Sequence, residues 1–94
     1  MILLRIEHEV LSFEGWKKAF DSDPIDRKKS GVKRYHIYQP VDNPKYVIID
    51  LEFDNLAQAQ MTQTTLKNMM TKIVGTLIIG PSIKILTDVE SKEY

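Results

Sequence analysis

Two hydrophobic periodicities alternate along this chain, and their order restricts the fold more than any other feature. Residues 2–10 place apolar side chains at every second position, the pattern of a strand with one buried face. The same period returns over 32–41, 46–53 and 82–90, with helical spacings of three and four between. The order strand, helix, strand, strand, helix, strand predicts an α+β ferredoxin-like fold: a four-stranded antiparallel sheet with two helices on one face.

The first helical region is expected in two parts. Ser12 is a suitable N-cap, and Trp16 and Phe20 recur at helical spacing on one side. The residue before a proline avoids helical geometry, so the first helix should stop before Pro24. We expect Asp23 to cap a short second helix over 24–31, opening with the proline and ending at a glycine.

The C-terminal half predicts one long helix and one strand. Asn55 is the expected cap of a helix that runs to about Val74. Glycines bracket residues 76–79, which we expect to form a short apolar loop. The strand over 82–90 should bury Ile83, Ile85 and Val89, and residues 91–94 should form a flexible tail.

Composition excludes several classes of protein. A chain of 94 residues fits one domain, 1–94, and its 13 basic residues balance its 13 acidic ones. There is no net field to attract nucleic acid or an anionic membrane, and no apolar run reaches the ~18 residues of a bilayer helix. Without cysteine the chain has no disulfides and no thiolate chemistry. The first residues become charged too soon for a signal peptide, so we expect a cytoplasmic protein.

One face of the predicted sheet has no helix over it, and its side chains are mixed in character. They are Leu3, Arg5, Glu7, Tyr46, Ile48, Asp50 and Leu86. Such a face is either exposed to solvent or covered by a second copy of the chain. We expect an isologous homodimer that buries the apolar members of this set. Arg5 and Lys84 would then pair with acidic side chains of the two sheets.

A ligand pocket is expected between the sheet and the helices. Its candidate residues are His8, Trp16, Phe20, Arg27 and His36. His8 is either a satisfied core residue or a base that orients a phenolic ligand. The two aromatic rings are either core or a surface on which a planar ligand stacks, and the arginine either pairs with a nearby aspartate or binds an anion.

The triplet Glu7-His8-Glu9 has the composition of a metal site but not the geometry. Strand alternation sends the histidine to one face and both glutamates to the other. Three side chains on opposite faces do not chelate one ion. We therefore predict no metal, and no motif predicts a cofactor.

A family resemblance rests on several segments of the chain. Residues 16–24, Arg27, Ser30-Gly31-Val32, the Asn43-Pro44 turn and Gly80-Pro81 together resemble the dimeric α/β-barrel superfamily. More narrowly, they resemble small proteins near the antibiotic-biosynthesis monooxygenase-like domains. The resemblance implies a homodimer whose two sheets form a barrel. It also implies a small-molecule pocket in each subunit, between sheet and helices.

The chain matches only part of the residue sets that the enzymes of this family share. Members that oxygenate polyketides without a cofactor resemble one another in an Asn, Trp and Arg or His set. Here Trp16 and Arg27 are present, while Asn43, Asn55 and Asn68 fall on a turn, a helix cap and a helix surface. Haem-degrading members place a histidine on the second helix, which has none here. The sequence thus predicts a dimer that binds a small apolar or aromatic ligand. The alternative is a cofactor-independent monooxygenase of an aromatic or polyketide-like substrate.

Overall fold

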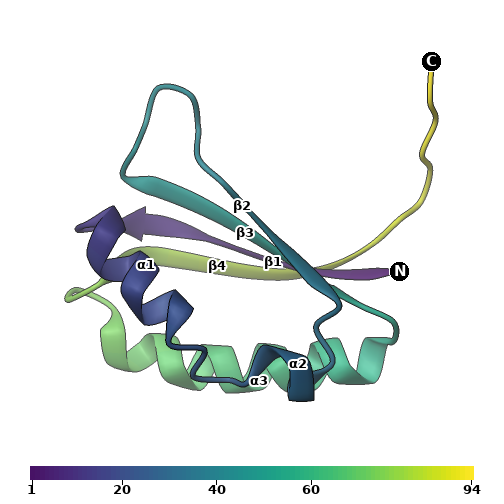
Figure 1. The fold of residues 1–94 in the computed structure, drawn as a ribbon, viewed down its shortest axis with the longest axis horizontal. Helices are drawn as coiled ribbons and strands as arrows, with labels where there is room; N and C mark the ends of the chain where they lie inside the picture. The colour runs from purple at the N-terminus through teal and green to yellow at the C-terminus, as the bar shows by residue number, and fades with distance from the viewer.

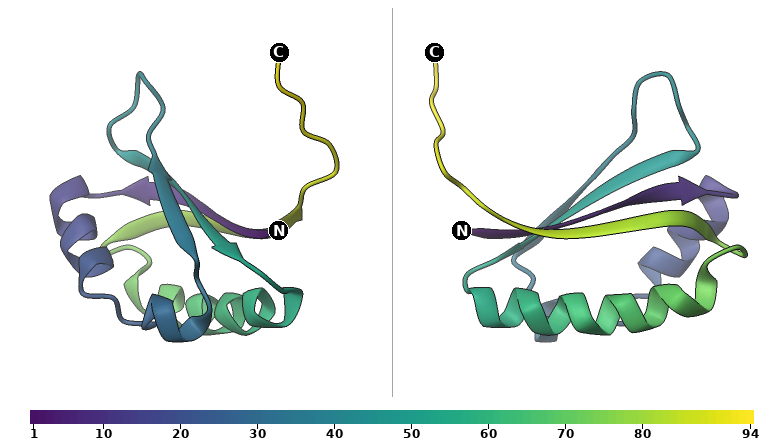
Figure 2. Two further views of the ribbon diagram at one scale, coloured as in Figure 1. Left: turned by 45° about the vertical axis from the view of Figure 1, so that its right-hand side comes forward. Right: turned by 180° about the vertical axis from the view of Figure 1, so that it is seen from behind.

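A sheet of four strands lies over three helices in this protein. The computed structural model describes residues 1–94 (Figure 1). In chain order the elements are β1 (Ile2–Val10), α1 (Phe13–Asp21), α2 (Arg27–Ser30), β2 (Arg34–Tyr38), β3 (Tyr46–Phe53), α3 (Leu56–Ile73) and β4 (Ile78–Thr87). The strand order is β2-β3-β1-β4, all neighbours are antiparallel, and all helices lie on one face (Figure 2). The predicted α+β ferredoxin-like fold is confirmed.

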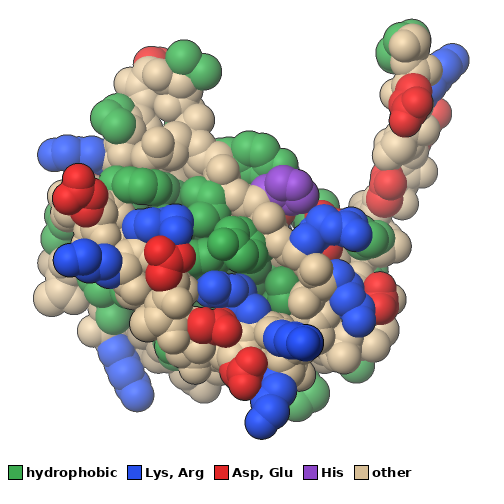
Figure 3. All heavy atoms as spheres, in the orientation of Figure 1, with side chains coloured by type: hydrophobic (Ala, Val, Ile, Leu, Met, Phe, Trp, Pro, Cys, Tyr) green, Lys and Arg blue, Asp and Glu red, His purple; other side chains and the backbone are tan.

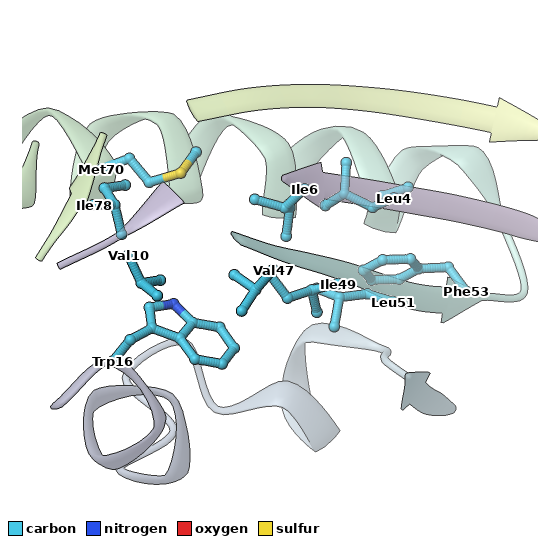
Figure 4. Close-up of a cluster of buried hydrophobic side chains, with 11 residues drawn as sticks. Leu4, Ile6, Val10, Trp16, Val47, Ile49, Leu51, Phe53, Met70 and Ile78 are labelled. Carbon is cyan, nitrogen blue, oxygen red and sulfur yellow. The ribbon is translucent and has the colours of Figure 1, made fainter. Parts of the chain in front are cut away.

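The hydrophobic core lies between the sheet and the helices. Its strand residues come mostly from β1 and β3, which are the two central strands. Figure 4 shows Trp16 from α1 near Val10 and Val47 of these strands, and Met70 from α3 near Ile78 of β4. Burying one side chain such as Phe53, which is fully enclosed, contributes about 1.5–3 kcal/mol. The alternation in the sequence therefore identified the buried face correctly.

Side chains cap the two longer helices as predicted. The Ser12 hydroxyl accepts a hydrogen bond from the Gly15 backbone N–H at 3.2 Å, at the start of α1. The Asn55 side chain accepts from the Gln58 N–H at 2.9 Å, at the start of α3. Each cap satisfies a backbone donor that has no partner within its helix.

The short helix begins later than predicted. α2 starts at Arg27 and is capped by Asp26, so the expected start at Pro24 with Asp23 as cap is wrong. Asp23 takes a left-handed backbone conformation, with φ of +54°, and the next two residues form a turn. Its carboxylate instead accepts a hydrogen bond from the Arg27 backbone N–H at 2.9 Å.

The last strand also begins earlier than predicted, because a glycine-proline pair lies within the strand and not in a turn. Residues 76–79 were expected to form a loop, but β4 already starts at Ile78, which is fully buried. The β1–β4 register shifts by one residue between Glu7 and Glu9. This shift leaves Gly80 and Pro81 together opposite His8, which is a β-bulge.

β2 is shorter than predicted, and β4 ends earlier than predicted. β2 covers residues 34–38 of the expected 32–41, and β4 ends at Thr87. Val89, expected to be buried, is exposed because it follows the strand. The β2–β3 loop and the segment after β4 both extend on the side of the sheet opposite the helices (Figures 1 and 2). No helix of the chain combines the length and apolarity that crossing a bilayer requires.

Candidate functional site

A cavity of about 120 Å³ lies between the sheet and the helices. Four of the predicted pocket residues line it: His8, Trp16, Phe20 and Arg27. Hydrophobic side chains make up 13 of its 16 lining residues, contributed by β1, β3, β4 and all parts of the helical layer. The cavity therefore combines an apolar wall with very few ionisable groups.

His8 is the buried polar group of the cavity. It extends from β1 and is only 3% exposed. Its Nδ1 lies 3.1 Å from the carbonyl oxygen of Glu9. A carbonyl only accepts hydrogen bonds, so Nδ1 carries the proton, and Nε2 of the neutral ring has a free lone pair. Burial lowers the pKa of His8, which keeps the ring neutral near pH 7.

A row of aromatic rings extends from His8 toward the surface. The His8 and Trp16 rings meet edge to face at 5.9 Å, and Trp16 stacks on Phe20 at 5.3 Å. Phe20 then meets the edge of Tyr35 at 4.9 Å. Because side chains alternate between the two faces along β2, Tyr35 points toward the helices. The sequence shows this alternation, but we did not use it to place Tyr35 beside the other rings. The first three rings of this row line the cavity, and Tyr35 lies outside it.

Arg27 closes the outer end of this row. Its guanidinium carbon lies 4.1 Å above the Phe20 ring, and its Nη1 donates to the Phe20 carbonyl at 2.8 Å. Its Nε is 3.5 Å from the Asp23 carboxylate, so the arginine pairs with a nearby aspartate, which was one of the two alternatives for it. On this side of the molecule Figure 3 shows a patch of apolar side chains bordered by charged ones. The charge of Arg27 is therefore already balanced within the chain.

His36 does not belong to the cavity, and its prediction as a pocket residue is wrong. Neighbouring side chains of a strand point to opposite faces, so Tyr35 on the helix side puts His36 on the open side. There its Nδ1 lies 3.5 Å from a carboxylate oxygen of Glu52. The ring is half exposed and stacks on Tyr38.

Sequence reasoning also missed part of the cavity wall. Ile25 lies in the turn before α2, a segment that we predicted to be helical. Leu77 and Ile78 belong to the segment that we predicted to be a loop. Each of these residues is apolar, but the orientation of its side chain depends on a backbone conformation that the sequence periodicity did not predict.

The open face of the sheet pairs its charges within the chain. Arg5 donates from Nε and Nη2 to the two carboxylate oxygens of Asp50, both at 2.8 Å. These hydrogen bonds raise the pKa of Arg5, and Asp50 is only 4% exposed. The Tyr46 hydroxyl donates to Glu7 at 2.6 Å, which raises the pKa of Tyr46. Ile48 lies between these two pairs, while Leu3 and Leu86 face each other on the far side of Arg5; all three are half-buried.

Comparison with solved structures identifies the same fold in other proteins. A Nitrosomonas europaea protein of unknown function superposes with a TM-score of 0.72 at 15% identity, over 99% of this chain and 93% of its own. A second protein of that organism, proposed to be an antibiotic biosynthesis monooxygenase, gives 0.70 at 15% identity, over 96% and 100%. A dimeric ferredoxin-like protein from an uncultured marine organism gives 0.68 at 12% identity, over 100% of both chains.

No protein-family model matches the chain, and neither does any curated protein. The structural neighbours are dimeric ferredoxin-like proteins, a proposed antibiotic-biosynthesis monooxygenase and proteins of unknown function. The predicted resemblance is thus confirmed. At these low identities the likeness concerns the fold.

Proposed function

We propose that this protein binds a small apolar or aromatic molecule in the cavity between sheet and helices. The observation that carries the proposal is an apolar cavity with a neutral imidazole in its wall and an aromatic row along one side. Binding sites for small molecules combine such apolar linings with one or two well-placed polar groups. His8 and Arg27 are the ionisable groups of the lining.

The proposal is tested by a thermal-shift screen over aromatic compounds. A ligand that binds only the folded state stabilises it by RT ln(1 + L/Kd), where L is the ligand concentration, so the midpoint of unfolding rises with ligand concentration. Ala19→Leu supplies the matched control, because Ala19 lies in α1 and lines the cavity, and leucine keeps a high helix propensity while filling space. We expect stabilisation of the native protein and a smaller one of this variant. A screen without any stabilising compound contradicts the proposal.

We also propose that two copies join through the open sheet faces into an α/β barrel. Two of the neighbours are described as dimeric ferredoxin-like proteins. The paired charges Arg5–Asp50 and Arg34–Glu52 lower the cost of covering this face, and Lys84 is the basic residue of the face that has no partner within the chain. The β2–β3 loop and the C-terminal segment also extend on this open side of the sheet (Figure 2). The loop carries the fully exposed Val41, and the C-terminal segment carries the fully exposed Tyr94.

Ile48→Lys tests the dimer, because Ile48 lies in the centre of the open face next to Glu7 and Tyr38. Two-fold symmetry would bury the new ammonium group twice, and removing a charge from water costs several kcal/mol even beside the Glu7 carboxylate, which already accepts a hydrogen bond from the Tyr46 hydroxyl. Leu56→Lys makes the same change on the exposed start of α3 and is the control. We expect light scattering to report dimers for the native protein and the control, and monomers for Ile48→Lys. A monomeric native protein contradicts the barrel.

A second candidate function is a cofactor-independent monooxygenase of an aromatic substrate. One of the neighbours is itself proposed to be an antibiotic-biosynthesis monooxygenase. The neutral ring of His8 beside Trp16 is suited to accept a proton from a hydroxylated aromatic ring. Oxygen uptake with a hydroquinone, compared among the native protein, His8→Ala and Trp16→Phe, tests it. Uptake no faster than without protein, or unchanged in both variants, contradicts this candidate.

A further inference from the structure

We infer that the cavity selects a neutral, single-ring ligand with one hydrogen-bond donor, a simple phenol by chemical class, and that Nε2 of His8 accepts that donor. The inference rests on the proposed function and narrows its ligand. It departs from the larger polyketide-like substrate of the monooxygenase alternative. Three properties of the cavity support the inference. They are its volume, the Nε2 of His8, which is free to accept a hydrogen bond, and Arg27, whose charge is already paired.

The size of the cavity admits one aromatic ring. Its volume is about 120 Å³. An engineered apolar cavity of ~150 Å³ in another protein holds a benzene molecule. A second or third ring would have to extend through the open side of the cavity or displace core side chains, which pack at the density of a crystal. The flexible thioethers of Met69 and Met70 give room for a methyl substituent but not for a second ring.

The free acceptor is Nε2 of His8. The Nδ1 of this ring is occupied by backbone carbonyl oxygen, that of Glu9 at 3.1 Å, and Nε2 makes no hydrogen bond in the chain. No fully enclosed side-chain nitrogen or oxygen lacks a partner, so Nε2 must touch open space. For a residue that is 3% exposed and lines the cavity, that space is the cavity. A ligand hydroxyl therefore finds a lone pair there and no competing donor on the same ring.

The balanced cation disfavours an anionic ligand. Arg27 already interacts with the Asp23 carboxylate, the Phe20 carbonyl and the Phe20 ring. A carboxylate ligand would have to separate this ion pair or lie among apolar side chains next to a neutral imidazole. Burying a charge without a partner is strongly unfavourable. The cavity should thus prefer the neutral phenol to an aryl carboxylate of the same size.

Five probes separate these properties in titration calorimetry on the full-length native protein. p-Cresol has one ring and a donor, toluene lacks the donor, and 4-methylanisole has an acceptor only. p-Toluate carries a charge, and 1-naphthol adds a ring. We expect p-cresol to bind about tenfold more tightly than toluene, the effect of one hydrogen bond in an apolar site. The other three probes should bind no more tightly than toluene.

His8→Phe replaces the imidazole by a ring of similar size without a lone pair. In this variant p-cresol should lose its advantage over toluene, while toluene still binds. If the variant does not fold, nitrogen NMR of the native protein replaces it: p-cresol should shift the Nε2 resonance of His8, and toluene should not. An unchanged Nε2 resonance, or an advantage that survives in His8→Phe, overturns the inference.

The two levels of proposal fail differently. Binding of p-cresol and toluene with equal affinity overturns the role of His8 but leaves the small-molecule site intact. Tighter binding of 1-naphthol or p-toluate than of p-cresol overturns the size or charge selection alone. If no probe binds and the thermal-shift screen is also empty, the proposed function itself is wrong.

Discussion

Gly31, which ends α2, is the position where an added methyl group should disturb this fold most directly. Its backbone has a φ of +99°, a conformation that L-residues with a Cβ avoid. A Cβ built there would lie 2.5 Å from the Cδ of Gln58 on α3. The glycine therefore lets α2, which carries Arg27, lie close against α3.

The expected cost of Gly31→Ala has two parts. Holding alanine in a left-handed conformation costs about 1–2 kcal/mol. Gln58 is half buried and flexible, so its side chain moves aside into a poorer rotamer at roughly 0.5–1.5 kcal/mol. The sum is about 1.5–3.5 kcal/mol. For a domain of this size it lowers the melting midpoint by on the order of 10 °C.

Urea denaturation at one fixed protein concentration measures this cost, because the stability of a dimer depends on concentration. Gly75→Ala is the matched control: its φ is +88°, but nothing lies within 4 Å of the added Cβ. We expect the control to lose only the backbone part. Gln58→Ala introduced with Gly31→Ala should recover most of the remainder. Equal losses for Gly31→Ala and Gly75→Ala would refute the steric part of this reasoning.

Two further predictions test the corrected last strand and the buried histidine. Ile78→Ala should destabilise the protein by about 2–5 kcal/mol and the neighbouring, 42% exposed Ile79→Ala much less, as measured by urea denaturation; similar losses would contradict the placement of β4. Burial lowers the pKa of His8, so the unfolded chain takes up the proton first, and stability should fall as pH drops below about 6.5. His8→Phe should remove this part of the slope and His36→Gln should retain it; an equal slope in His8→Phe contradicts the assignment.

The order of the elements could be predicted because the two central strands bury the apolar side chains of the face that meets the helices. That condition gives β1 and β3 a clear period of two in their side chains. The wrong predictions concern short motifs that are found in more than one kind of local structure. Gly80-Pro81 is typical of a turn, but on an edge strand the same pair forms a bulge, since the missing N–H of Pro81 is not needed there.

The candidate site was predictable where a side chain follows from the face of its element. His8, Trp16 and Phe20 lie on inward faces and line the cavity. The ion pair Arg5–Asp50 was not predictable, since it depends on the register between strands 45 residues apart in sequence. The sequence shows that both residues share the open face. Only the paired strands show which acid the arginine contacts.

The bulge opposite His8 also bears on how this protein resists aggregation. β4 is an edge strand, and an edge with a regular row of free N–H and C=O groups invites pairing with another chain. Pro81 removes one donor from that row, and the two-residue bulge bends the rest out of line. A substitution that removed the bulge would therefore also leave a longer regular edge that can pair with another chain. The same two residues, Gly80 and Pro81, thus shape both the free edge of the sheet and the strand segment opposite His8.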